Sequence, residues 1–325
     1  MNFYKNILYL FLMVSSIITI SASTWLTAWL GLEFNIMAIL PIMKSTNKFN
    51  SESTIKYFII QAMASSILLI SSMFIFNFMN YLYMYIILTA LFMKVGAAPF
   101  HFWLPEIISG MNWFTIFIIL TWQKLAPMIL MKNIIIPHYF YLIIIFSVIL
   151  GSLQGLNQTC MRKIMVFSSI NHMGWMISSL MMSIKLWMLY FFLYLIINWN
   201  LIFLFYKNNI YYFTHLNKLI TYNKNMKLVF LFNFFSLGGM PPFLGFLPKW
   251  MIINLLINNY YFSLIFIMII MTIMSLYFYT RILLAPLSMN ILESKICNFS
   301  NSFLYTMNFM FLFIITPSLI FIMLF

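Results

Sequence analysis

Long apolar stretches follow one another along almost the whole chain, each about as long as a membrane-spanning helix and separated from the next by a short polar break. A soluble globule is excluded, because 64% of the 325 residues are hydrophobic, only 6% are charged and the mean hydropathy is +1.01. The sequence therefore predicts an all-α polytopic membrane protein that forms a single transmembrane domain over residues 1–325, with no soluble domain.

A helix needs about 20 apolar residues to cross the hydrocarbon core of a bilayer, and this rule divides the chain into about eleven spans. An odd number of spans places the two termini on opposite sides of the membrane. The predicted spans are residues 5–22, 25–43, 57–76, 82–103, 111–131, 137–156, 164–183, 186–206, 227–253, 258–285 and 303–324.

Cationic residues in the predicted loops fall mainly on one side of the membrane, and such residues are retained on the side of synthesis. We therefore expect the N-terminus inside and the C-terminus outside. Contact with anionic lipid head groups accounts for much of the net charge of +13, so a nucleic-acid partner is not expected. The outer loops contain Lys132 and Lys185, whereas the inner side contains Lys5, Lys44, Lys48, Lys56, Arg162, Lys163, Lys207, Lys218, Lys224, Lys227 and Lys295.

Glu33, Lys94, Lys124 and Lys249 are charged and lie inside predicted spans. A charge at the bilayer centre costs about 2.5 to 3.5 kcal/mol on insertion scales, so such residues usually face a hydrated or paired interior and mark an ion or proton path. Desolvation lowers the proton affinity of a lysine and a nearby carboxylate raises it. The four residues are therefore predicted to be proton-handling groups.

Two predicted spans contain helix breakers at membrane depth, and each also contains one of these lysines. The fourth span reads KVGAAPFH from Lys94 to His101, and the ninth reads SLGGMPPF from Ser236 to Phe243, shortly before Lys249. Irregular backbone inside a membrane is tolerated only where it is buried in protein or lines a hydrated cavity. The pattern therefore predicts two broken helices beside a polar interior.

The two broken helices lie five spans apart, which is the spacing expected of an inverted-topology repeat. We expect a first repeat over residues 1–131, a second over residues 137–285 and a closing helix over residues 303–325. In this arrangement His172 in the seventh span is the counterpart of Glu33 in the second. A lone histidine inside a membrane is often only a hydrogen-bonded core residue, so a structural role and a relay role both stay open for His172.

Five segments of the chain resemble the chain 2 family of NADH-ubiquinone oxidoreductase, in its insect form. These proteins are the mitochondrially encoded, antiporter-like subunits of respiratory complex I. The segments are WLTAWLGLEFN at 25–35, KVGAAPFHFW at 94–103, TWQKLAP at 121–127, LNQTCMRKIMVFSSINHMGW at 156–175 and FSLGGMPPFLGFLPKW at 235–250.

The resemblance implies two inverted five-helix bundles with a closing helix, in the mitochondrial inner membrane, with the N-terminus in the matrix and the C-terminus in the intermembrane space. The implied partners are other antiporter-like chains and small core subunits of the membrane arm, together with inner-membrane lipids, cardiolipin among them. It also implies that Glu33 and Lys94 form an ion pair whose opening passes a proton through Lys124 towards Lys249.

The sequence contains no dinucleotide-binding fingerprint, P-loop or metal-ligand cluster, and Cys160 and Cys297 stand alone. We expect no cofactor or metal in this chain. Within an NADH:ubiquinone reductase that translocates protons, the NADH site, FMN, iron-sulfur clusters and ubiquinone would belong to partner subunits.

Two other functions stay open from the residues alone. A stand-alone antiporter would use Glu33, Lys94 and Lys124 to exchange sodium for protons, and it would not depend on partner subunits. A structural scaffold would use its polar residues only to bind water and neighbours. The scaffold predicts that Lys124→Met leaves proton pumping intact once assembly is controlled.

Overall fold

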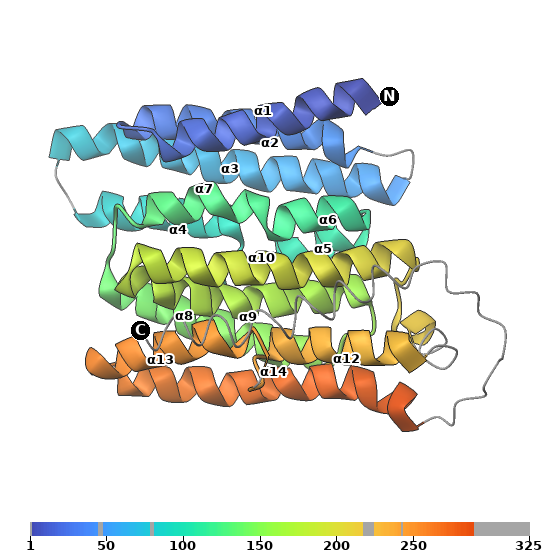
Figure 1. Ribbon diagram of the computed structural model, residues 1–325. Helices are drawn as coiled ribbons and strands as arrows, with labels where there is room; N and C mark the ends of the chain where they lie inside the picture. Colours follow the sequence, from blue (N-terminus) through green and yellow to red (C-terminus); the bar gives the residue numbers. More distant parts are fainter. Residues whose placement is uncertain (1, 45–47, 79–80, 217–223, 242, 289–325) are drawn as a thin grey trace. The chain divides into compact units, whose positions relative to one another are not determined.

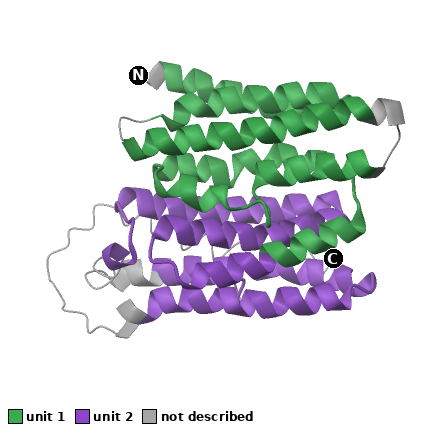
Figure 2. Ribbon diagram, turned by 180° about the vertical axis from the view of Figure 1, so that it is seen from behind, with its two compact units in different colours: residues 1–147 green, residues 148–325 purple. Residues whose placement is uncertain are grey.

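The computed structural model describes residues 2–44, 48–78, 81–216, 224–241 and 243–288. In these residues the chain is helical, with one isolated antiparallel bridge between Cys160 and Tyr212. The chain divides into two compact units, Met1–Ser147 and Val148–Phe325 (Figure 2). The closing helix predicted over residues 303–325 lies outside the described residues.

Unit 1 is a bundle of helices (Figure 1). Its centre is formed by α4 and α7, which pack together, while α3 covers α4 and α1 packs against both α2 and α7. The helices are α1 (Asn2–Ile20), α2 (Trp25–Met43), α3 (Lys48–Phe78), α4 (Tyr81–Val95), α5 (Trp103–Ser109), α6 (Trp113–Leu120), α7 (Trp122–Met131) and the first part of α8 (Pro137–Leu156).

Unit 2 is built around α9 (Met161–Met182), in which every residue from Ile164 to Leu180 is buried. Its other helices are α10 (Ile184–Lys207), α12 (Lys224–Gly238), α13 (Phe246–Asn258) and α14 (Phe262–Ser288). α9 packs against α10, α13 and α14. Because neighbouring helices rather than lipid surround α9, it accommodates several serines, an asparagine and a histidine that a lipid-facing helix would not tolerate.

The observed helices can be compared with the predicted spans. α2 and α8 have the predicted bounds, 25–43 and 137–156. Six helices of the described residues are long and apolar enough to cross a membrane, and four more apolar helices are shorter. The protein is thus a membrane-embedded, multi-pass helical chain. The total of eleven spans and the inverted arrangement of the two repeats stay predictions.

The close packing of α1 and α2 depends on Gly31, two residues before Glu33. A Cβ at Gly31 would lie 3.0 Å from the backbone nitrogen of Thr19 and would also overlap the Thr19 side chain. Thr24 caps the N-terminus of α2, and its hydroxyl accepts a hydrogen bond of 3.3 Å from the Thr27 N–H. These two features fix where the helix that contains Glu33 begins and how near it lies to α1.

Candidate functional site

The first predicted break is present directly after Lys94. α4 ends at Val95, and Gly96 adopts a φ of +74°, a left-handed conformation that strongly favours glycine. The N–H groups of Gly96 and Ala97 both donate to the carbonyl of Phe92, at 2.9 and 3.1 Å, which closes the helix end. The Lys94 side chain is only 5% exposed, so the break holds a buried cation in the last turn of α4.

The second predicted break has the same local geometry. Gly239 adopts a φ of +75°, and the N–H groups of Gly239 and Met240 both donate to the carbonyl of Phe235, at 3.0 and 3.2 Å. In each break the backbone N–H of a following phenylalanine donates to the carbonyl three residues earlier: Phe100 donates to Ala97, and Phe243 donates to Met240. The two broken helices were therefore predicted correctly, and each interrupts its helix with a left-handed glycine.

Lys249 lies across the second break rather than before it. It belongs to the first turn of α13, is 6% exposed, and its Nζ donates to the carbonyl of Gly238, the last residue of α12, at 2.8 Å. The ammonium also lies 5.7 Å from the centre of the Trp175 ring in α9. A cation at the C-terminal end of a helix is stabilised by the helix dipole and by the unpaired carbonyls there.

A third interruption, close to Lys124, was not predicted, because the span 111–131 was expected to be continuous. The helix instead ends at Leu120 and resumes at Trp122, with φ −118° and ψ −75° at Thr121. The Thr121 hydroxyl donates to the Phe117 carbonyl at 2.6 Å and competes with the helical hydrogen bonds. Pro127 in the same stretch does not account for this break, because the helical hydrogen bond that it lacks is the one to the Gln123 carbonyl.

Among the charged residues that the structure describes, Lys124 is the most completely buried, at 1% exposure. Its backbone N–H donates to the Thr121 carbonyl at 3.1 Å, so it lies in the tightened turn directly after the interruption. Lys94, Lys124 and Lys249 thus share one structural property: each is buried and lies within four residues of a helix interruption.

A small polar cavity lies beside Lys94 inside unit 1. It has a volume of about 10 Å³, roughly the space that one water molecule requires. Gln123 Nε2 donates to Asn35 Oδ1 at 3.0 Å across the cavity wall, and Gln61 Nε2 donates to the Lys94 carbonyl at 3.3 Å. The lining residues are Leu32, Asn35, Ile36, Gln61, Lys94, Gln123 and Pro127.

Asn35, Gln61 and Gln123 were not singled out from the sequence. Asn35 follows Glu33 by two residues, and Gln123 directly precedes Lys124. Each is an amide side chain inside an apolar stretch, which is the signal that would have identified it. The three amides connect α2, α3 and α7 to the surroundings of Lys94 through hydrogen bonds that a purely apolar core would lack.

Glu33 is half-buried on α2 and interacts electrostatically with the Lys94 ammonium. Both residues lie in the described part of the chain, and no hydrogen bond or ion pair joins them there. The carboxylate therefore acts on Lys94 through space. Closure of this gap into a direct ion pair stays a prediction.

His172 has the partner that a core histidine requires. Its Nδ1 lies 2.8 Å from the Tyr190 hydroxyl, and its ring centre is 5.2 Å from that of Tyr194. The side chain is 6% exposed. This hydrogen bond is sufficient to explain why a histidine is buried at this position. The relay role of His172 stays a prediction.

The charged and polar residues thus form separate groups. Unit 1 brings Glu33 and Lys94 together with the amides of the cavity, and unit 2 places Lys249 against Gly238 and Trp175. Among the described residues no group of three or more His, Cys, Asp or Glu side chains is placed to bind a metal. Cys160 is a free thiol, and Cys297 lies outside the described residues.

A family model described as NADH:quinone oxidoreductase/Mrp antiporter, TM, matches residues 22–275. The chain belongs to this family. A curated relative from Anopheles gambiae, named NADH-ubiquinone oxidoreductase chain 2, is 44% identical over 290 residues, which cover 86% of this chain and 84% of the relative. The resemblance to chain 2, including its insect form, is thereby confirmed.

Two solved structures share the fold. Respiratory complex I from Thermus thermophilus with bound aureothin contains a chain that matches with a TM-score of 0.80 and 22% identity, covering 87% of this chain and 70% of the other. The Mrp complex from Dietzia sp. matches with a TM-score of 0.74 and 14% identity, covering 85% of this chain and 59% of the other. Both matches support the antiporter-like membrane fold.

Proposed function

We propose that this chain is a proton-translocating subunit in the membrane arm of a mitochondrial NADH:ubiquinone oxidoreductase. The family and the relatives named chain 2 support the assembly. The observation that supports proton translocation most strongly is that Lys94, Lys124 and Lys249 are buried, each beside a helix interruption. Burying a cation is expensive, and a chain that retains three such lysines uses them for ion or proton movement.

Within unit 1 the proposed path begins at Glu33 and Lys94. A change of protonation at either group alters the electrostatic potential at the other, because Glu33 already acts on Lys94. A water in the polar cavity would accept a hydrogen bond from the Lys94 ammonium. The same water would also form hydrogen bonds with the Asn35 and Gln123 amides. The proton would then pass to Lys124, the residue that directly follows Gln123.

Lys249 is the proposed acceptor in unit 2. Its ammonium donates to the Gly238 carbonyl, and this interaction stabilises the protonated form. Release of the proton removes the charge and weakens the interaction with the end of α12. The transfer from Lys124 to Lys249 and onward to the intermembrane space is part of the proposal. Moving one charge against the membrane potential requires about 2.3 kcal/mol per 100 mV, which a rearrangement of buried charges can supply.

The energy for this movement would come from quinone reduction in other subunits. NADH, FMN, iron-sulfur clusters and ubiquinone would bind to those partners, and this chain would convert their redox energy into proton movement. We place the chain in the mitochondrial inner membrane, with the N-terminus in the matrix. Its neighbours there would be other antiporter-like chains and small core subunits.

Membership of the assembly is tested by native electrophoresis of inner membranes solubilised in mild detergent. An antibody to this chain and an in-gel stain for NADH dehydrogenase activity are expected to label the same band. A separate small species without NADH activity would instead support a free sodium/proton antiporter, the function that the Mrp-like fold also permits. Sodium-gradient flux in vesicles would then be the next measurement.

The relay itself is tested with Glu33→Gln and Lys124→Met in the assembled enzyme. Both variants are expected to assemble, as judged by the native gel, and to lower NADH-driven turnover. The matched control is Lys132→Met, because Lys132 lies directly after α7 and outside the buried lysines. Normal turnover in both variants would support the scaffold alternative and overturn the relay.

A further inference from the structure

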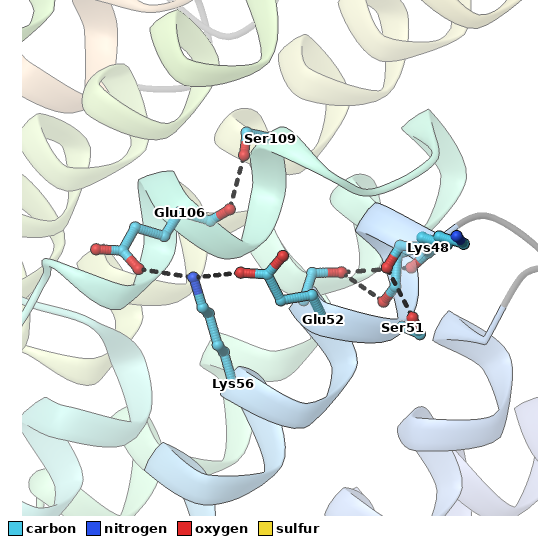
Figure 3. Close-up of polar contacts among 8 residues, drawn as sticks. Lys48, Ser51, Glu52, Lys56, Glu106 and Ser109 are labelled. Atoms are coloured by element: carbon cyan, nitrogen blue, oxygen red, sulfur yellow. Dashed lines mark hydrogen bonds and ion pairs between the residues drawn. The ribbon is translucent and has the colours of Figure 1, made fainter.

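An ion cluster joins α3 and α5 on unit 1 (Figure 3). Lys56 Nζ lies 2.9 Å from Glu52 Oε1 and 3.4 Å from Glu106 Oε2. The three side chains are accessible, at 44% for Lys56 and 63% for each glutamate. The chain has only four acidic residues and a net charge of +13, and two of those carboxylates converge on the single ammonium of Lys56.

An apolar groove opens next to this cluster. Its volume is about 190 Å³, and its wall consists of Ile59, Ile60, Trp103 and Ile107, with Lys56 and Glu106 at the polar end. Trp103 is held in place because its Nε1 donates to the Met93 carbonyl at 3.2 Å and its ring packs edge-on against Tyr57. The groove thus combines a rigid apolar wall with charged groups of both signs at its mouth.

The length of α3 places this mouth near the surface of the membrane. α3 contains 31 residues and is therefore about 46 Å long, whereas the hydrocarbon core is about 30 Å thick. Its first turns, which contain Lys48, Glu52 and Lys56, are the polar part and extend into the head-group region. Lys56 lies about 12 Å along the helix from its start, at the boundary between head groups and acyl chains.

We propose that this groove binds a zwitterionic phospholipid whose head group contains a primary ammonium, as in phosphatidylethanolamine. The acyl chain would pack against Ile59, Ile60 and Trp103. The phosphate would accept from the Lys56 ammonium, and the lipid ammonium would donate to the second oxygens of the Glu52 and Glu106 carboxylates.

The charge of the cluster selects this occupant over an anionic lipid. The Glu52 and Glu106 carboxylates repel a head group that contains phosphates without a compensating cation. Cardiolipin, a lipid partner that the family resemblance implies, would therefore bind this groove poorly, whatever its binding elsewhere on the chain. None of the groove residues belongs to the proposed relay, although the Trp103 indole donates to the carbonyl of Met93, the residue before Lys94.

The site is tested on the purified, assembled enzyme with a phosphatidylethanolamine that contains a photoactivatable group in its acyl chain. After irradiation, mass spectrometry of peptides is expected to find the lipid attached near Ile59 and Trp103. Unlabelled phosphatidylethanolamine should suppress this labelling about tenfold more effectively than cardiolipin, the ratio expected for one charge-assisted contact. Equal suppression by cardiolipin, or no labelling of these peptides, would overturn the proposal.

Two variants locate the head-group contacts. Glu106→Gln is expected to reduce the preference for phosphatidylethanolamine about tenfold, because a neutral amide replaces one of the carboxylates that bind the ammonium. Lys48→Gln, an exposed lysine at the start of the same helix, should leave the preference unchanged. The native gel controls for assembly. If a carbodiimide crosslinks Glu52 or Glu106 to a lysine of a neighbouring subunit, a protein occupies the groove and the lipid site is wrong.

Discussion

Gly239→Ala is expected to damage the protein by two separable effects at the second helix break. A residue with a side chain at φ +75° is strained by about 1–2 kcal/mol. In addition, the new Cβ would lie 2.9 Å from both Cδ and Nζ of Lys249, so the lysine must move away and lose its hydrogen bond to Gly238. A hydrogen bond from a charged group contributes about 1.5–3 kcal/mol, which gives a total cost of about 2.5–5 kcal/mol.

A double-mutant cycle separates the two effects. In a Lys249→Ala background the strain remains, but the displaced hydrogen bond is already absent, so Gly239→Ala should cost less by about 1.5–3 kcal/mol. The assay is the rate at which the assembled complex is lost on heating, followed by native electrophoresis. This coupling energy predicts that Gly239→Ala accelerates the loss of the complex roughly 10- to 150-fold less in the Lys249→Ala background than in the wild-type background. Additive effects of the two substitutions would refute a Lys249 side chain that lies across the break.

Three further substitutions test other contacts. Gln123→Leu removes the donor to Asn35 Oδ1 and leaves this buried acceptor unpaired, at a cost of about 1–3 kcal/mol. Turnover of the assembled complex should therefore fall. Wild-type turnover would contradict a role for the cavity. Tyr190→Phe removes the hydroxyl that contacts His172 and should cost about 1 kcal/mol of thermal stability; a loss of proton pumping at normal stability would instead favour the relay role of His172. Gly245→Ala places a Cβ on a backbone carbonyl of α12 and should prevent assembly, as immunoblotting of native gels would show; normal assembly would contradict the close packing there.

The positions of most helices could be predicted because apolar stretches of the required length are visible in the sequence. α2 and α8 have the predicted bounds, and Gly96 and Gly239 mark the two breaks. The N-terminal bound of α3 was placed too late. The span rule counts only apolar residues, whereas α3 continues outward from the membrane as a polar helix that begins at Lys48.

The burial of the candidate site residues could be predicted in part, whereas their roles stay predictions. The buried lysines were found because a charge inside an apolar stretch is conspicuous, and Lys94, Lys124 and Lys249 are all buried. The Asn35–Gln123 hydrogen bond joins residues far apart in the sequence, so only the three-dimensional structure reveals it. The interruption at Thr121 depends on a side-chain hydrogen bond that competes with the helix, which composition and periodicity do not indicate.

Proton stoichiometry tests the central claim most directly. The assembled enzyme is reconstituted into sealed vesicles with Lys124→Met or with the control Lys132→Met, and protons translocated are measured per NADH oxidised. We predict that Lys124→Met lowers this ratio or stops coupled turnover, because it removes the buried proton carrier, whereas Lys132→Met retains the wild-type ratio. A wild-type ratio and turnover in Lys124→Met would contradict proton translocation through this chain.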